Sequence, residues 1–134
     1  MSLLSPLLRR TRLSLIAPHL RGAVLDVGCG SEATMYSACR ARISRYVGID
    51  RSPETVLELQ ARFPEARFVA RDLDHQPLAL GEKFDCVIMA ALIEHLFNQE
   101  FVMRQIADVL TPGGAVYLTT PTVIGNDVVH RLGS

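Results

Sequence analysis

Five short apolar runs follow one another along the chain, and stretches with a helical pattern lie between them. Within each run the apolar residues are nearly continuous, with no alternation between apolar and polar positions. That pattern is typical of strands that are buried on both faces of a parallel sheet. We therefore predict five strands, at residues 23–27, 46–49, 67–70, 84–90 and 115–120.

The stretches between these runs carry helix signals. Residues 33–42 are expected to form one helix, and Ser52 is expected to cap the next, because Pro53 suits the first helical position. Asn98 is expected to cap a third helix with one apolar face, and the TPGG segment at 111–114 is expected to end it. Strands that alternate with helices in this way predict an α/β fold with a doubly wound, mostly parallel sheet.

The N-terminal stretch is rich in leucine, and three arginines, Arg9, Arg10 and Arg12, interrupt the leucines. These charges rule out a bilayer-spanning helix, which needs roughly 20 consecutive apolar residues. We favour a helix that packs on the sheet with its arginines in water over a helix on a membrane surface, because a basic amphipathic pattern alone is weak support for a membrane. The expected organisation is an N-terminal helical segment at 1–21 and an α/β domain at 22–134.

Composition limits the classes of function. The chain has 134 residues, enough for one domain, and its 14 lysines and arginines equal its 14 aspartates and glutamates. Without a net charge the whole molecule has no long-range attraction to nucleic acid or to an anionic membrane, so neither is expected as a partner. The three cysteines form no C-x-x-C pair, and they predict a reduced, cytoplasmic protein.

A glycine-rich turn follows the first predicted strand. In VLDVGCGSEA, at residues 24–33, Gly28, Gly30 and Ala33 spell G-x-G-x-x-A. Alone the pattern is weak, because a turn that only lets strand and helix pack has the same glycines. Asp50, however, ends the second predicted strand, where nucleoside-binding α/β folds place the acid that binds ribose hydroxyls. The two features together predict a cofactor that contains adenosine.

Asp26 distinguishes between two kinds of such cofactor. A fixed negative charge two residues before Gly28 would repel a pyrophosphate, which needs backbone N–H groups and a helix dipole. The same charge would attract the ammonium group of S-adenosylmethionine, whose sulfonium is also cationic. We therefore expect S-adenosylmethionine. A nicotinamide-dependent oxidoreductase is the less favoured alternative, because it rests on G-x-G-x-x-A alone.

Five segments in a fixed order resemble the motifs of a known family. They are VLDVGCG, YVGIDRS, ARDLD, FDCVIMAALIEHL and LTPGGAVYLTTP, and they span about residues 22–121. On these motifs the sequence is similar to class I S-adenosylmethionine-dependent methyltransferases, especially the small-molecule, type 11-like kind. The resemblance implies a Rossmann-like methyltransferase fold, the strand order 3-2-1-4-5, a crevice between strands one and four, and S-adenosylhomocysteine as the product.

The resemblance also implies roles for particular residues. Asp26 would lie near the amino group of the cofactor, Asp50 on the ribose hydroxyls and Asp72 near the adenine amino group. Arg51 would lie beside the ribose, and Leu73 against the adenine ring. The other expected cofactor contacts are Gly28, Cys29, Gly30, Ala90 and Leu92.

The segment after the fourth predicted strand is expected to face the methyl acceptor. His95 is the candidate general base there, because a near-neutral imidazole can take the proton of a hydroxyl as it is methylated. An alternative of equal weight is that Glu94 and His95 only cap the next helix or orient the loop. Asp72, Asp74 and His75 could suggest a metal site, but without a second cluster of ligands a solvated acidic loop is favoured, and no metal is expected.

Two features depart from the family pattern. Glu32 stands where the family commonly has a third glycine. Residues 123–134 are too few for the helix and the antiparallel hairpin that complete the family's seven-stranded sheet. We therefore expect the last two strands to be missing and the fifth strand to be an exposed edge, through which a homodimer would form.

The favoured function is the transfer of a methyl group from S-adenosylmethionine to a small-molecule acceptor. An alternative on the same fold is an S-adenosylmethionine-binding fragment or inactive module that binds the cofactor without catalysis. The nicotinamide-dependent oxidoreductase is the third interpretation.

Overall fold

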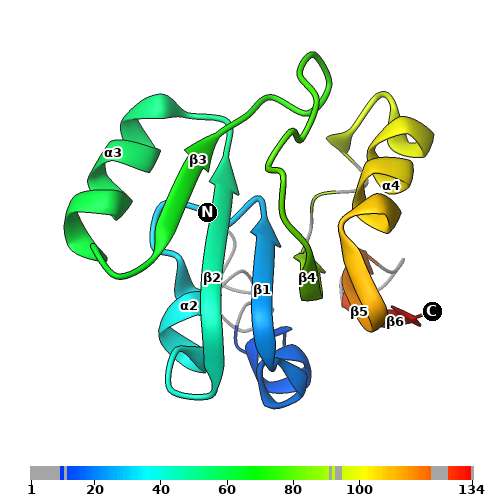
Figure 1. Cartoon of the computed structure of the whole chain (residues 1–134), viewed down its shortest axis with the longest axis horizontal. Helices are drawn as coiled ribbons and strands as arrows, with labels where there is room; N and C mark the ends of the chain where they lie inside the picture. The colour runs from blue at the N-terminus through cyan, green and yellow to red at the C-terminus, as the bar shows by residue number, and fades with distance from the viewer. Residues whose placement is uncertain (1–9, 11, 91, 93–94, 122–126, 134) are drawn as a thin grey trace.

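The computed structural model describes residues 10, 12–90, 92, 95–121 and 127–133. They form one sheet with the strand order β3-β2-β1-β4-β5-β6 and with helices on both faces (Figure 1). The strands are β1 (Gly22–Val27), β2 (Ile43–Asp50), β3 (Arg67–Ala70), β4 (Phe84–Met89), β5 (Leu110–Pro121) and β6 (Asp127–Gly133). The helices are η1 (Ala17–His19), α2 (Thr34–Cys39), α3 (Pro53–Arg62) and α4 (Gln99–Asp108).

Strands β1 to β5 run parallel to one another, and they correspond to the five predicted strands. The prediction of an α/β fold with a doubly wound, mostly parallel sheet is confirmed. β1 pairs with β2 on one side and with β4 on the other, so the order of the strands reverses between β1 and β4. A ligand crevice is expected at such a reversal, beyond the carboxyl ends of the strands.

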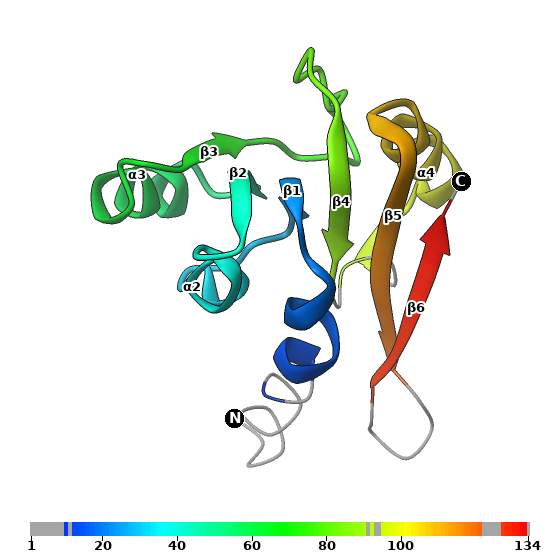
Figure 2. The same cartoon turned by 60° about the horizontal axis from the view of Figure 1, so that its bottom comes forward.

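Apolar side chains cover both faces of the sheet. The N-terminal helix, α2 and α3 pack on the face of Val24, whereas α4 and part of the connection at 71–83 pack on the face of Leu25 (Figure 2). Val24 and Leu25 are neighbours in β1, and both are fully buried. Successive residues of a strand point to opposite faces, so a strand that is covered on both sides must be apolar throughout. This explains why the strands show no alternation in the sequence.

The described part of the N-terminal helix packs on the sheet, as predicted. Residues 12–16 are helical and continue into η1, and Ile16 and Leu20 are buried in the core with α2 and the sheet. The Arg42 side chain donates a hydrogen bond of 2.7 Å to the carbonyl oxygen of Ala17, which fixes η1 beside the end of α2. Within the described ranges, no helix is long and apolar enough to cross a membrane.

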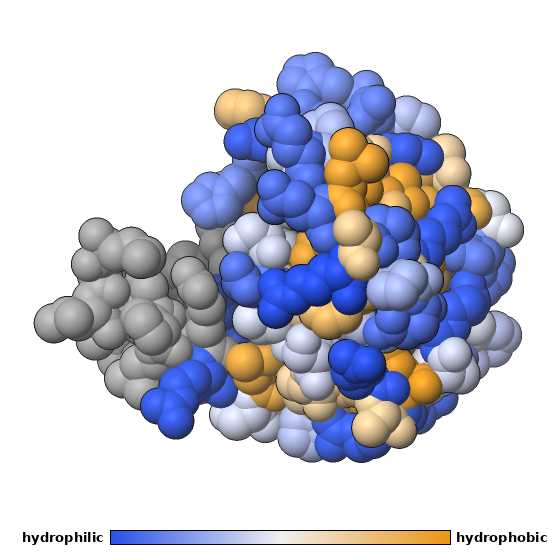
Figure 3. All heavy atoms as spheres, turned by 90° about the vertical axis from the view of Figure 1, so that its left-hand side faces the viewer, coloured by the Kyte–Doolittle hydropathy of each residue, from blue (hydrophilic) through white to orange (hydrophobic). Residues whose placement is uncertain are grey.

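The start of α3 follows the sequence signals. Ser52 Oγ accepts a hydrogen bond of 3.2 Å from the backbone N–H of Thr55, and Pro53 is the first helical residue. The bond satisfies a backbone donor that has no partner within the helix, so the predicted cap is confirmed. The face of the molecule on the α3 side is mostly hydrophilic, with smaller apolar areas between polar groups (Figure 3).

The start of α4 is where the sequence predicts it, but the predicted side-chain cap is absent. Asn98 is the N-cap residue, and its side chain makes no capping hydrogen bond. Its carbonyl oxygen accepts a bond of 3.1 Å from the N–H of Val102, which is an ordinary helical bond. We infer that the burial of Val102 and Ile106 holds α4 in place.

The TPGG segment belongs to β5, whereas the sequence predicts a strand only from residue 115. β5 starts at Leu110, which pairs with Phe84, and the next pair joins Ala115 to Cys86. Two steps along β4 therefore face five steps along β5, and residues 111–114 bulge out between the two pairs. The chain does turn at 111–114, as the sequence predicts. The turn is a bulge within β5 because β4 pairs with Leu110 before it and with Ala115 after it.

Asp85 lies between the two pairs and ties the bulge to β1. Its carboxylate accepts a hydrogen bond of 2.8 Å from the N–H of Ala23 and one of 2.9 Å from the Thr111 hydroxyl. The bond from Ala23 is the main cause that lowers the pKa of Asp85 below its usual value. Gly22 is required beside it, because its φ is +62° and a Cβ there would collide with the carboxylate.

A further strand follows β5, so the prediction that the fifth strand is an exposed edge is wrong. β6 runs antiparallel to β5, with residue pairs from Ala115 and Gly133 to Pro121 and Asp127 (Figure 2). The residues after β5 are too few for a helix and two strands, but an antiparallel neighbour needs only a short connection. The edge of β5 is therefore already paired within the chain, and the predicted homodimer through that edge loses its structural basis.

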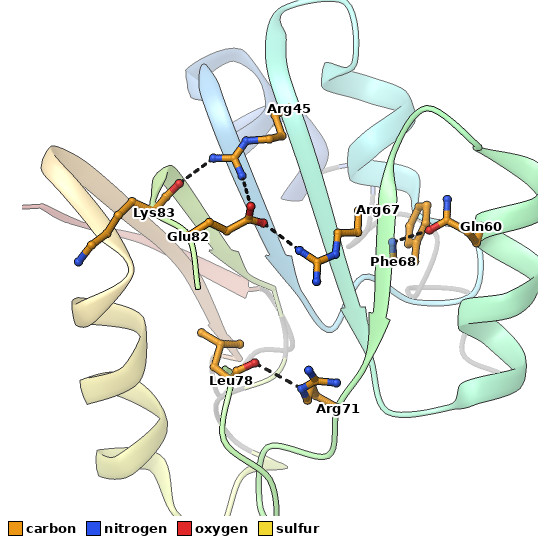
Figure 4. A network of polar contacts seen from close by, with 8 residues as sticks. All are labelled: Arg45, Gln60, Arg67, Phe68, Arg71, Leu78, Glu82 and Lys83. Carbon is orange, nitrogen blue, oxygen red and sulfur yellow. Dashed lines mark hydrogen bonds and ion pairs between the residues drawn. The ribbon is translucent and has the colours of Figure 1, made fainter. Parts of the chain in front are cut away.

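The connection between β3 and β4, at residues 71–83, contains no helix. Polar contacts hold it against the sheet (Figure 4). Arg71 Nε donates a hydrogen bond of 3.3 Å to the carbonyl oxygen of Leu78, and Glu82 forms an ion pair of 2.7 Å with Arg45 of β2. Leu78 is buried, so this loop covers part of the sheet itself. Its first residues are those predicted to bind the adenine.

Candidate functional site

The carboxyl ends of the parallel strands open onto two cavities that share Gly28. The first cavity, on the side of the glycine turn and α2, has a volume of about 260 Å³. The second cavity, between the ends of β2 and β3 and the segment after β4, has a volume of about 430 Å³. Both adjoin the end of β1, where the strand order reverses.

The structure brings together residues that were predicted from separate motifs. The first cavity is lined in part by Asp26, Gly28, Cys29, Gly30 and Ala90. The second cavity is lined in part by Asp50, Arg51, Asp72, Leu73, Leu92 and His95. Every residue expected to contact the cofactor therefore lies on one of the two cavities. Glu94, the remaining candidate, lies outside the described residues.

Asp26 is a buried residue of β1, inside the strand predicted at 23–27 and not in the turn that follows it. It is only 3% exposed, and its Oδ2 accepts a hydrogen bond of 2.6 Å from the Tyr46 hydroxyl. Burial raises the pKa of Asp26 to about 6, and the bond from Tyr46 opposes part of this rise. The carboxyl group is therefore mainly charged above pH 6 and mainly neutral below it.

Tyr46 reaches Asp26 across a glycine of β2. In the sheet register Val24 lies beside Tyr46, and Asp26 lies beside Gly48, one pair further along the same face. Gly48 leaves room for two rings, because a Cβ there would lie 2.8 Å from a ring carbon of Phe68 and 3.0 Å from one of Tyr46. Sequence reasoning missed this contact, since Tyr46 has the pattern of an ordinary strand residue. The YVG spacing of tyrosine and glycine is the signal that could have revealed it.

The glycine turn is fixed to the end of β2. The N–H groups of Gly28 and Cys29 both donate to the carbonyl oxygen of Ile49, at 2.8 and 2.9 Å. Gly28 and Gly30 have φ values of +79° and +77°, which favour glycine. A Cβ at Gly28 would also lie 3.4 Å from the Leu92 side chain, so the turn packs closely against the segment after β4.

Cys29 is held as a neutral thiol inside this turn. Burial is the main cause that raises the pKa of the Cys29 thiol, and the nearby charges of Asp26 and Asp50 raise it further. A thiol that stays protonated is a poor nucleophile. Cys29 therefore contributes a small side chain to the turn and no nucleophilic chemistry.

Asp50 is the last residue of β2 and faces the second cavity. Its Oδ1 accepts a hydrogen bond of 3.0 Å from the N–H of Ser52, which fixes the carboxylate at the turn into α3. In the register Asp50 lies beside Ala70, the last residue of β3. The chain after β3 therefore starts next to Asp50, which explains how Asp72 reaches the same cavity.

The acidic loop after β3 is stabilised by its own contacts. His75 Nδ1 lies 3.0 Å from Asp72 Oδ2, and this hydrogen bond is the main cause that lowers the pKa of Asp72. Asp74 Oδ1 accepts a bond of 2.9 Å from the N–H of Phe97, which joins the loop to the segment after β4. In the part of the chain that the structure describes, no group of three or more His, Cys, Asp and Glu side chains could hold a metal ion.

His95 lies on the second cavity, together with Asp50 and Asp72. It is exposed, and its backbone N–H donates a hydrogen bond of 2.9 Å to the carbonyl oxygen of Leu92. The candidate base is thus in the cavity of the predicted ribose and adenine contacts. Asp26 lies in the other cavity.

Two charged residues that were not predicted as contacts also line the first cavity, Arg12 and Glu32. The sequence predicts that Arg12 faces water, but it is half-buried. The available signal is its position four residues before the buried Ile16, which puts both residues on one helical face. The Glu32 carboxylate lies 3.0 Å from Arg62 Nη1 of α3, so this side chain turns toward α3.

Comparison with known proteins reveals similarity over most of the chain. A family model described as a methyltransferase domain matches residues 25–118. A probable S-adenosylmethionine-dependent methyltransferase from Mycolicibacterium smegmatis is 32% identical over 101 residues, which cover 75% of this chain and 38% of that protein. The human mitochondrial ubiquinone biosynthesis O-methyltransferase is 27% identical over 128 residues, which cover 86% of this chain and 34% of that protein.

A tRNA U34 carboxymethyltransferase from Campylobacter curvus is 28% identical over 115 residues, which cover 81% of this chain and 39% of that protein. This chain therefore spans less than two-fifths of the length of these relatives. The activities in the names of these relatives therefore belong to proteins that are longer than this chain.

Solved structures share the fold. YcgJ from Bacillus subtilis has a TM-score of 0.72 at 21% identity, with 84% of this chain and 51% of that chain covered. The N-methyltransferase NodS from Bradyrhizobium japonicum, solved with S-adenosylhomocysteine, has a TM-score of 0.69 at 19% identity, with 83% and 59% covered. Because the family model matches more than half of the sequence and the fold agrees, the chain belongs to the methyltransferase-domain family of class I S-adenosylmethionine-dependent methyltransferases.

Proposed function

We propose that this chain binds S-adenosylmethionine across the two cavities and transfers its methyl group to a small-molecule acceptor. The observation that carries the proposal is the convergence of residues from separate motifs on cavities that share Gly28. Cavities of about 260 and 430 Å³ are close to the size of small-molecule sites, roughly 300–1,000 Å³.

In the first cavity, Asp26 would hold the ammonium group of the methionine moiety. A buried carboxylate is costly when it is charged, and a cationic ligand group beside it offsets that cost. Asp26 therefore fits a positively charged ligand. Gly28 and Gly30 would let the ligand approach the backbone closely, because neither residue carries a Cβ.

In the second cavity, Asp50 would accept hydrogen bonds from the ribose hydroxyls, with Arg51 beside them. Asp72 would accept a hydrogen bond from the adenine amino group, because its carboxylate lies on this cavity. Leu73 and Leu92 would pack against the adenine ring. The polar and apolar groups of the cavity thus suit the two parts of adenosine.

The same contacts make a nicotinamide cofactor less favourable. A pyrophosphate needs N–H groups from the glycine turn, but those of Gly28 and Cys29 already donate to Ile49. Asp26 adds negative charge under the turn. The following helix, α2, has six residues and no side-chain cap at its start, so its positive end is weak.

When bound, the cofactor would supply a methyl group on a sulfonium, and an acceptor lone pair would take this methyl group while the sulfur kept the electrons of the broken carbon–sulfur bond. The protein would align the acceptor with this methyl group and exclude water. His95 is the proposed general base, because an imidazole can take the proton that a hydroxyl acceptor loses. Glu94 is the second candidate in this segment.

A small molecule is the proposed acceptor class. The names of two relatives refer to different acceptors, a ubiquinone precursor in biosynthesis and a tRNA uridine. Equal numbers of basic and acidic residues favour the small molecule, because tRNA binding depends on a positive field at the protein surface.

Calorimetry with S-adenosylhomocysteine tests the binding site. The wild-type chain should bind this ligand, and Asp50→Ala should weaken its affinity by about tenfold or more while the domain stays folded. Asp108→Ala is the matched control, because Asp108 is exposed at the end of α4. Unchanged affinity in Asp50→Ala would refute the ribose assignment. Stabilisation by NADH but not by S-adenosylhomocysteine would favour the oxidoreductase.

Methyl transfer separates an enzyme from a binding module. The chain is incubated with S-adenosylmethionine that carries a labelled methyl group and with a panel of small hydroxylated and amino compounds, and in parallel with tRNA. Transfer to a small molecule supports the proposal. Transfer to tRNA alone contradicts the acceptor class, and binding without any transfer favours a cofactor-binding module.

A further inference from the structure

One contact at the second cavity comes from a residue outside the shared motifs. Asp72 lines this cavity, and His75 Nδ1 lies 3.0 Å from its Oδ2. The motif in this loop, ARDLD, ends at Asp74, and His75 is the next residue. The motif therefore does not account for the contact.

The contact is a hydrogen bond that the imidazole donates. An ionised carboxylate can only accept, so the Nδ1 atom at 3.0 Å carries the proton. The same bond is the main cause that lowers the pKa of Asp72. An aspartate is already ionised at neutral pH, with an ordinary pKa of about 3.9. The bond from His75 therefore matters for the direction of the carboxylate and not for its charge.

Both oxygens of the Asp72 carboxylate are held from within the loop. Oδ1 accepts a hydrogen bond of 3.2 Å from the N–H of Asp74, and Oδ2 accepts the bond from His75. Each carboxylate oxygen has two lone pairs, so these bonds leave acceptor positions for a ligand. A carboxylate that is held at both oxygens keeps its remaining lone pairs in one direction.

The backbone of this loop is held by other bonds. Gln76 Oε1 accepts a hydrogen bond of 2.7 Å from the N–H of Asp72. The Asp72 carbonyl oxygen accepts bonds from the N–H groups of His75 and Gln76, at 3.0 and 2.7 Å. Leu73 is buried and anchors the turn. The His75 side chain is 77% exposed, so its ring adds little packing to a turn that is already closed.

We infer that His75 directs the Asp72 carboxylate toward the amino group of the adenine, and thereby sets the preference of the site for adenine over a base with a carbonyl oxygen at that position. This inference rests on the proposed function. A carboxylate that turns freely would gain less from an amino group and lose less against a carbonyl oxygen, because both effects depend on direction. His75 is thus a positioning residue, which acts through Asp72.

Two ligands that differ at one group of the base test the inference. S-adenosylhomocysteine has an amino group there, whereas S-inosylhomocysteine has a carbonyl oxygen, which a carboxylate repels. Calorimetry on the 134-residue chain at neutral pH gives the Kd of each ligand, and the ratio of the two values measures the preference. The wild type should prefer S-adenosylhomocysteine by about tenfold or more.

His75→Ala should lower this ratio by about two- to fivefold, which is the range for a contact between charged groups that is open to water. His75→Asn should restore most of the ratio, because its amide N–H can take the place of the Nδ1–H. Asp72→Asn should lower the ratio further than His75→Ala does. In the Asp72→Asn background, His75→Ala should then have no additional effect, because the two residues act as a pair.

Gln76→Ala is the control for the order of the loop. It removes the side-chain acceptor of the Asp72 backbone N–H and leaves both contacts of the carboxylate in place. It should change the two Kd values by the same factor, so the ratio should match that of the wild type.

Three results would overturn the inference. An unchanged ratio in His75→Ala would mean that His75 does not set the preference. Tighter binding of S-adenosylhomocysteine by His75→Ala would mean that the imidazole competes with the adenine for Asp72. An equal fall of the ratio in Gln76→Ala would mean that the order of the loop, and not the contact from His75, sets the preference.

The wild type separates this inference from the proposed function. Equal binding of both ligands would refute the adenine contact at Asp72, and the inference with it, while cofactor binding would stand. Binding of neither ligand would refute the proposed function itself. Thermal melting checks that the variants fold, and His75→Asn supplies the comparison where His75→Ala does not.

Discussion

Asp26 belongs both to the core of the sheet and to the wall of a cavity. Its carboxylate is buried, and the Tyr46 hydroxyl is its hydrogen-bond donor at 2.6 Å. The raised pKa, about 6, reflects the cost of keeping a charge away from water. A proton or a cationic ligand can remove this cost. Both stability and ligand binding should therefore depend on pH through this residue.

Asp26→Asn tests the effect on stability. Between an unfolded pKa of 3.8 and a folded pKa of about 6, the folded protein binds more protons than the unfolded chain. The contribution of Asp26 to stability therefore falls as pH rises through this window, by roughly 3 kcal/mol in total. Asparagine does not titrate. The free energy of unfolding of Asp26→Asn, measured with urea and compared with that of the wild type, should therefore be about 3 kcal/mol higher at pH 8 than at pH 4. A difference that stays constant with pH would contradict the assignment.

Tyr46→Phe tests the effect on binding. In the proposed site the ammonium group of the ligand binds the charged form of Asp26, so the affinity of the wild type for S-adenosylhomocysteine should fall as pH falls through about 6. Without the Tyr46 hydroxyl the pKa of Asp26 should rise further, and the fall in affinity should begin at a higher pH. Calorimetry across this range measures both curves. The ligand 5′-methylthioadenosine, which lacks the ammonium, should show no such shift.

His95→Gln distinguishes the two roles considered for this residue. As a general base, His95 contributes roughly 10²- to 10⁴-fold to kcat with a hydroxyl acceptor, while the Kd for S-adenosylhomocysteine stays the same. As part of the cofactor wall, the same substitution weakens S-adenosylhomocysteine and leaves kcat nearly unchanged. Steady-state kinetics together with calorimetry separate these results, and an unchanged kcat would refute the catalytic role.

Sequence reasoning found the residues that belong to contiguous motifs and missed those that depend on packing. Asp50 ends β2 and Asp72 lies two residues after the end of β3, so the parallel topology brings them to one cavity. For Tyr46 and Arg12 the sequence offers only weak signals, the YVG spacing and a position four residues before Ile16. One reaches Asp26 only because β2 lies beside β1, and the other reaches the cavity only because the N-terminal helix docks on the sheet.

At the level of elements, the bulge before the main part of β5 shows how one side chain joins three segments. Asp85 of β4 binds the backbone of β1 at Ala23 and the hydroxyl of Thr111 in the bulge. The sequence predicts a turn at TPGG but not its incorporation into the strand. Such pairing depends on the register between β4 and β5, which local propensity does not set.

Substitutions at the Asp85 contacts, which we call the Asp85 clamp, should lower the free energy of unfolding by different amounts. Asp85→Ala removes both bonds and leaves the N–H of Ala23 without this acceptor, so the free energy of unfolding should fall by about 1–3 kcal/mol. Thr111→Val removes one bond and should lower it by about 0.5–1.5 kcal/mol. Asp108→Ala, on the surface, should stay within about 0.5 kcal/mol of the wild type. Urea unfolding measures all three, and equal effects of the first two would argue against the clamp.

At the scale of the whole molecule, β6 decides how the sheet ends. The continuous apolar runs predict the parallel part of the sheet, because strands that are covered on both faces need them. β6 was missed because the expected continuation required a helix and a hairpin, whereas the chain turns back directly along β5. A short antiparallel return leaves only a weak signal in the sequence.

Removal of residues 127–134 should expose the edge of β5. The unpaired backbone groups of β5 would then be available to another chain, so the shortened protein should associate with increasing concentration while the full chain does so less. Size-exclusion chromatography with light scattering compares the two proteins at matched concentrations. A shortened chain that stays monomeric at the highest concentration would contradict this role of β6.

The buried carboxylate under the glycine turn also has a consequence for the lifetime of the protein in a cell. Proteases cut chains that open transiently, and a molecule without bound ligand, in which the buried Asp26 charge has only the Tyr46 hydroxyl as its donor, should open more often than one with ligand bound. If the proposed cationic ligand binds beside Asp26, the steady-state abundance of the protein should rise and fall with the supply of that ligand.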